Sequence, residues 1–180
     1  MKLSRIASGV IMNKNGINVL GLITESKEFG ESSVVLFPEK EEGIIKREGR
    51  FHISGEGEWE IGDVLVIGNK GEKECFYLLN FDEIQVLFVD NALDIDDAFR
   101  KISSDIDVFV IPVDSIVDLD SIKKRIDSID TGAIVFLLRE GTEVPAWINE
   151  VTRGKELSTV KKVDISAKIK DKKSFYFLIS

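Results

Sequence analysis

The chain has 180 residues and a net charge of −8, with 43% hydrophobic and 31% charged residues. This composition indicates a globular protein with a sizeable core and excludes a disordered chain. The acidic balance argues against binding to duplex DNA, which needs a basic surface, and no apolar run reaches the roughly 20 residues of a membrane span.

Cysteine and histidine each occur once, as Cys75 and His52. A lone cysteine excludes an intramolecular disulfide, and these two residues cannot form a zinc site built from several Cys or His ligands. Both lie in strand patterns, ECFYLLN and RFHIS, so we interpret them as structural residues. The N-terminal segment has no signal-peptide core, which predicts a cytoplasmic protein. Scarce Gln, Cys and His beside abundant Lys and Glu are typical of thermophile proteins.

The first half of the chain predicts short strands separated by turns. RIASGVIM and INVLGLIT flank Asn15-Gly16, a dipeptide that favours a tight hairpin turn. The strand patterns that follow are SSVVLF, GIIKRE, RFHIS, GEWEI, DVLVIG and ECFYLLNF. Short strands with frequent Gly and no helical period predict a small all-β domain over residues 1–81, either a barrel or a sandwich.

The hydrophobic period changes at Phe81. IQVLFVD, DVFVIPVD and GAIVFLLRE are continuous apolar runs, as expected for strands buried on both faces. Helical spacing follows each run, in DIDDAFRKISSDI, DLDSIKKRIDSID and TEVPAWINEVTRG, and STVKKVDI and SFYFLIS predict a closing hairpin of strands. The order β-α-β-α-β-α-β-β predicts a Rossmann-like, mostly parallel three-layer α/β domain over residues 82–180. The chain as a whole is then of the α/β (α+β overall) class.

An acidic motif occurs twice, 24 residues apart, where two of these predicted strands end. Its first copy holds Asp90, Asp94 and Asp96, which align with Asp114, Asp118 and Asp120. The carboxyl ends of neighbouring parallel strands meet at one edge of a sheet, where ligands bind. Asp90 and Asp114, with Glu140 at the end of the next strand, are therefore candidate ligands for Mg²⁺. The alternative, which we favour on sequence alone, is that the motif binds no metal, and that Asp94 or Asp96 caps the first helix and Asp118 or Asp120 the second.

Charge is segregated along the second half. Residues 82–130 contain 13 Asp and Glu against 5 Lys and Arg, whereas basic residues dominate 153–173. Segregated charge suggests oriented contact with a partner. The candidate partner-binding residues are lysines near the last strands: Lys161, Lys162, Lys168, Lys170, Lys172 and Lys173.

The sequence contains no phosphate-binding glycine loop and no nucleophile elbow. Together with the segregated charge, this predicts a non-catalytic binding or adaptor protein in a larger cytoplasmic assembly, with another protein as partner and no cofactor. Two alternatives stay open. One is a Mg²⁺-dependent phosphoester-processing enzyme that uses Asp90, Asp114 and Glu140. The other is a binder of single-stranded nucleic acid through the barrel and the basic C-terminal hairpin.

Overall fold

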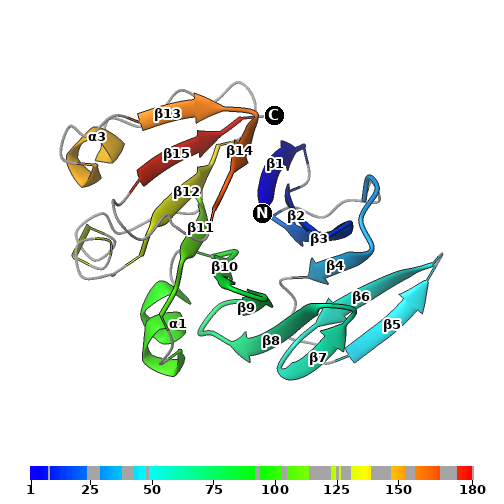
Figure 1. Cartoon of the computed structure of the whole chain (residues 1–180). Helices are drawn as coiled ribbons and strands as arrows, with labels where there is room; N and C mark the ends of the chain where they lie inside the picture. The colour runs from blue at the N-terminus through cyan, green and yellow to red at the C-terminus, as the bar shows by residue number, and fades with distance from the viewer. Residues whose placement is uncertain are drawn as a thin grey trace.

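The computed structural model describes most of the chain as two β-sheets packed face to face, with helices on the outer face of one sheet (Figure 1). The described residues are 1–7, 9–23, 29–37, 43–47, 49–91, 94–102, 105–113, 123, 124, 126, 131–138, 147–152, 157–166 and 174–179. No helix among them is long and apolar enough to cross a membrane.

The first sheet, sheet A, has seven strands in the described part of the chain. Their spatial order is β14 (Lys162–Asp164), β1 (Lys2–Ile6), β2 (Gly9–Lys14), β3 (Ile17–Leu22), β4 (Val34–Phe37), β6 (Arg50–Ser54) and β5 (Gly43–Arg47). The predicted hairpin is confirmed, because Asn15 and Gly16 have φ values of 53° and 83° and Lys14 pairs with Ile17. Positive φ at both central residues is the geometry that Asn-Gly supplies in two-residue hairpin turns.

The second sheet, sheet B, has eight described strands. Their order is β13 (Leu157–Val160), β15 (Ser174–Leu178), β12 (Ala133–Leu137), β11 (Val108–Pro112), β10 (Ile84–Val89), β9 (Cys75–Phe81), β8 (Val64–Lys70) and β7 (Gly57–Ile61). The first five of these are parallel to one another, and β9, β8 and β7 continue the sheet as antiparallel neighbours.

Sheet B is buried on both faces, and each face packs against a different layer. In β10, Val86 and Phe88 point into the core between the two sheets, whereas Leu87 and Val89 point toward the helices. The helical layer includes α1 (Ile95–Lys101) and α3 (Trp147–Val151), which bury Ala98, Ile148 and Val151 against that face. Burial on both faces explains why these strands are continuous apolar runs.

The predicted fold class is wrong in how the strands are layered. The strands of residues 1–81 do not close a separate barrel or sandwich, because β1 pairs with β14 and β7 to β9 lie in the same sheet as β10. The second half is not a three-layer Rossmann-like unit either, because one face of its sheet packs against sheet A. Nothing tests the division at residue 81, which stays a prediction.

The predicted C-terminal hairpin is also wrong. β13 and β15 are parallel neighbours in sheet B, so they cannot be the two arms of a hairpin. Between them the chain crosses to sheet A, where β14 pairs antiparallel with β1, and Figure 1 shows the orange β14 beside the blue β1. The backbone N–H of Ile165 donates to the carbonyl of Met1 (2.7 Å) and extends this contact.

Candidate functional site

The candidate site lies at the edge of sheet B where the parallel strands end. Asp90 follows Val89, the last residue of β10; its side chain is half-buried and its Oδ1 atom is buried. The structure pairs β10 with β11 in parallel, with Phe88 opposite Val110, so both strands end at the same edge as predicted. Asp114 and Glu140 lie outside the described residues.

Asp94 has a role that the sequence analysis did not predict. It occupies the N-cap position of α1, but its side chain makes no capping hydrogen bond. Its carboxylate instead accepts hydrogen bonds from the backbone N–H groups of Lys73 and Glu74, each at 2.7 Å, in the turn between β8 and β9. Of the two predicted capping residues, Asp94 thus occupies the N-cap position without making the capping hydrogen bond. The side chains of Asp96, Asp118 and Asp120 are outside the described part of the structure.

Arg5 of β1 reaches the same edge from the other sheet. Its side chain is buried, and its Nε atom lies 3.5 Å from the carbonyl oxygen of Leu138, the residue after β12. The guanidinium also donates to the carbonyls of Gly9, at 2.5 Å, and Ile6. Arg5 therefore joins the β1–β2 turn to the carboxyl end of β12. An arginine inside an alternating strand gave no sequence signal for this contact.

His52 and Cys75 lie apart from each other in different layers. His52, on β6, packs its ring against Phe29 and Phe37, with centroid distances of 5.3 and 5.4 Å, on the outer face of sheet A. Cys75 begins β9 and is buried in the core between the sheets. Across the described residues, no group of three or more His, Cys, Asp or Glu side chains could hold a metal ion.

Two of the six candidate partner-binding lysines are described, and both are exposed. Lys161 lies between β13 and β14, where its carbonyl accepts a hydrogen bond from the backbone N–H of Arg5 (3.2 Å), and Lys162 begins β14. Lys168, Lys170, Lys172 and Lys173 lie outside the described residues. Their role in binding another protein stays a prediction, as does the cytoplasmic location.

No family model and no curated protein matches the chain, but solved structures do. A candidate Zn-dependent hydrolase of the metallo-β-lactamase superfamily from Thermotoga maritima aligns over 100% of both chains, with a TM-score of 0.68 and 13% identity. A candidate metal-dependent hydrolase from Parabacteroides distasonis aligns over 82% of this chain and 85% of its own, with a TM-score of 0.56 and 9% identity. A mutant of the CmlA β-hydroxylase has a TM-score of 0.56 and 11% identity, over 97% of this chain and 52% of that one.

At these identities the likeness shows a shared fold, which is that of the metallo-β-lactamase superfamily protein. It corrects the prediction of a non-catalytic adaptor with a Rossmann-like domain, because two of the three structures are described as metal-dependent hydrolases. Of the functions considered from the sequence, the metal-dependent enzyme agrees best with these neighbours.

Proposed function

We propose that the protein is a metal-dependent hydrolase that acts on phosphoesters and holds its cation with carboxylates at the ends of the parallel strands. The observation that carries the proposal is the position of Asp90. It directly follows β10 at the edge where the parallel strands of sheet B end, and the fold is shared with candidate metal-dependent hydrolases.

The residues present do not fit zinc. Zinc sites in proteins take several His or Cys ligands, whereas this chain has one of each. His52 lies on the outer face of sheet A and Cys75 in the core, so the two do not converge on Asp90. Carboxylate oxygens are the donors that Mg²⁺ and Mn²⁺ prefer. We therefore assign the site to one of these two cations.

Asp90 is the described ligand of the proposed site. The sequence supplies Asp114 after β11 and Glu140 after β12 as the further carboxylates. A bound Mg²⁺ or Mn²⁺ would supply Lewis-acid polarisation of a phosphoryl oxygen. Arg5 lies beside this part of the chain, because its Nε atom is 3.5 Å from the carbonyl oxygen of Leu138, two residues before Glu140.

Thermal melting with and without millimolar Mn²⁺ or Mg²⁺ tests the proposal. Binding to the folded state alone stabilises it by about 2.7 kcal/mol when the ligand is at roughly 100 times its Kd, so we expect the wild-type melting temperature to rise. Asp90→Asn should abolish the rise, because the amide keeps the shape of the side chain but removes its charge. The matched control is Asp63→Asn, an exposed aspartate in the turn between β7 and β8, which should leave the rise intact.

Hydrolysis is measured on the same three proteins with p-nitrophenyl phosphate and bis-p-nitrophenyl phosphate. We expect Mn²⁺-dependent release of p-nitrophenol by the wild type and by Asp63→Asn, and none by Asp90→Asn. A wild-type protein whose melting temperature ignores both cations and which cleaves neither ester would contradict the proposal. A response to Zn²⁺ alone would contradict the choice of cation.

A further inference from the structure

We infer that Asp94 is a positioning residue for Asp90: its carboxylate is docked on the backbone of the β8–β9 turn, and its N–H binds the carbonyl of Asn91, the residue next to Asp90. The role of Asp90 as a cation ligand rests on the proposed function. The docking contact itself does not depend on that proposal, because every atom that makes it is described.

Both oxygen atoms of the Asp94 carboxylate accept hydrogen bonds from the backbone. The side chain of Asp94 is 0% exposed. Oδ1 accepts the backbone N–H of Lys73 and Oδ2 accepts that of Glu74, both at 2.7 Å. Hydrogen bonds from N–H groups to an ionised carboxylate are shorter and stronger than neutral ones. Two such bonds offset the loss of hydration that burial of this carboxylate would otherwise cost.

The β8–β9 turn leaves space for the side chain of Asp94. Its ends are closed by a hydrogen bond from the N–H of Gly71 to the carbonyl of Glu74, at 2.8 Å. A Cβ atom on Gly71 would lie 2.4 Å from both Cγ and Oδ1 of Asp94, far inside any normal contact. The same Cβ would lie 2.7 Å from the carbonyl oxygen of Glu74, so a side chain at Gly71 would disturb both the carboxylate and the turn that binds it.

The other end of α1 contacts the end of the strand that leads into this turn. Lys101, the last residue of α1, donates from Nζ to the carbonyl of Lys70 at 2.5 Å, and its ammonium lies 5.9 Å from the ring centroid of Phe76. One end of α1 is thus attached to the β8–β9 turn and the other to the last residue of β8. The helix and the turn form one unit at the edge of sheet B.

This unit is continuous with the segment that carries Asp90. Phe76 pairs with Val89 in the sheet, and Asp90 follows Val89 directly. At the far end of the segment, the N–H of Asp94 donates to the carbonyl of Asn91, at 3.0 Å. Asp90 and Asn91 are therefore joined to β10 on one side, and the carbonyl of Asn91 is bound by the N–H of Asp94 on the other. A ligand that is already held in place loses less conformational entropy when it binds a cation, so the docking of Asp94 should raise cation affinity.

Two substitutions disrupt the docking from opposite sides. Asp94→Asn keeps the side-chain shape but turns an amide N–H₂ toward a backbone N–H, and Gly71→Ala places a methyl group against both the carboxylate and the carbonyl oxygen of Glu74. Glu72→Gln is the matched control, because Glu72 is in the same turn and its side chain is 70% exposed. If Asp94→Asn does not fold, Lys101→Met loosens the same unit from its other end.

Three measurements are made on each variant: amide hydrogen exchange, Kd for Mn²⁺ by electron paramagnetic resonance, and melting temperature. In Asp94→Asn and Gly71→Ala we expect faster exchange at Lys73, Glu74 and Asp94. We also expect about a tenfold or greater rise in the Kd for Mn²⁺, as for other groups that orient a metal ligand. Glu72→Gln should match the wild type. A Kd that stays unchanged in both variants while these amides lose protection would overturn the inference.

Two further outcomes are decisive. If Asp94→Asn loses Mn²⁺ binding but Gly71→Ala binds normally, Asp94 is itself a ligand and the inference is overturned. If the wild type binds no Mn²⁺, the proposed function fails, and the backbone amide signals of Asp90 and Asn91 decide the inference alone. Signals that shift in both variants support positioning through Asp94, and signals that stay in place overturn it.

Discussion

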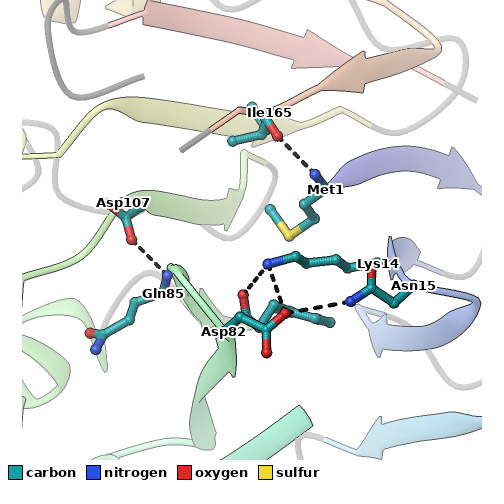
Figure 2. Close-up of polar contacts among 8 residues, drawn as sticks. Met1, Lys14, Asn15, Asp82, Gln85, Asp107 and Ile165 are labelled. Carbon is teal, nitrogen blue, oxygen red and sulfur yellow. Dashed lines mark hydrogen bonds and ion pairs between the residues drawn. The ribbon is translucent and has the colours of Figure 1, made fainter. Parts of the chain in front are cut away.

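At the scale of single residues, one lysine joins the two sheets at the end of the molecule opposite the candidate site. Lys14 donates from Nζ to the carbonyl of Phe81 at 2.6 Å and lies 3.2 Å from Oδ2 of Asp82 (Figure 2). Asn15 and Asp82 both have φ near 53°, so each belongs to a tight turn, one from sheet A and one from sheet B. Asn15 adds a second polar contact to Asp82, at 3.4 Å. The two turns are thereby held together.

Lys14→Met should lower the free energy of unfolding by about 1–2 kcal/mol, because a hydrogen bond from a charged group to a partly buried carbonyl is lost. The side chain of Lys14 is only 20% exposed. The control is Lys73→Met, whose ion pair with Glu72 joins side chains that are 51% and 70% exposed and which should change stability little. Urea unfolding followed by circular dichroism measures both. Equal losses in the two variants would mean that the Lys14 contact contributes no more than a surface ion pair.

At the scale of elements, the two sheets interlock where β3 crosses β10. Gly21 of β3 faces the ring of Phe88 on β10, and a Cβ on Gly21 would lie 2.8 Å from that ring. Phe88 is fully buried in the core between the sheets. The close approach of these two strands therefore depends on a glycine opposite a large aromatic side chain.

Gly21→Ala should destabilise the protein by about 1–3 kcal/mol, because the added methyl group overpacks this contact. Phe88→Leu alone should also destabilise it, since the smaller side chain leaves a cavity. Combined, the two changes should cost less than the sum of their separate effects, because leucine leaves space for the methyl group. A double-mutant cycle of urea unfolding free energies measures this coupling. Strict additivity would show that Gly21 and Phe88 do not constrain each other.

The individual strands could be predicted from the sequence, but their assembly into layers could not. Alternating or continuous apolar runs show how many faces of a strand are buried, and β10 is indeed buried on both. They do not show whether a sheet or a helix covers each face. The predicted Rossmann-like unit assumed helices on both faces, whereas sheet A covers one of them.

At the candidate site, the acidic motif likewise predicted where a strand ends but not what its side chains contact. Its spacing placed Asp90 correctly at a strand end, because apolar runs mark where strands stop. The role of Asp94 depends on a turn about 20 residues earlier in the chain, and spacing within the motif carries no information about that contact. Asp107 is a parallel case, since its buried carboxylate accepts the N–H of Gln85 at 2.7 Å (Figure 2). In both cases the carboxylate accepts a hydrogen bond from a backbone N–H group that lies far from it in the sequence.

At the scale of the whole molecule, each sheet takes strands from both halves of the chain. Sheet B combines β7, β8 and β9 with the parallel strands of the second half, and β14 returns from the second half to sheet A. Arg5 adds a contact from β1 to Leu138 after β12. Separating the halves would therefore break backbone pairing in both sheets and expose the core between them. From this arrangement we expect the two halves to unfold together and not as two domains divided at residue 81.

The chain has one tryptophan in each half, and both report on packing. Trp59 lies on β7, close to Gly57 and Gly68, and the ring of Trp147 on α3 packs edge-on against Phe136, with centroids 6.1 Å apart. Trp147→Phe leaves a fluorescent reporter in the first half, and Trp59→Phe leaves one in the second. Because the two halves share both sheets, we expect each reporter to give a single urea transition that coincides with the circular dichroism transition of the same variant. Circular dichroism corrects for any difference in stability between the variants. If the reporter in one half unfolds at a lower urea concentration than the secondary structure, the halves unfold separately and the division at residue 81 is supported.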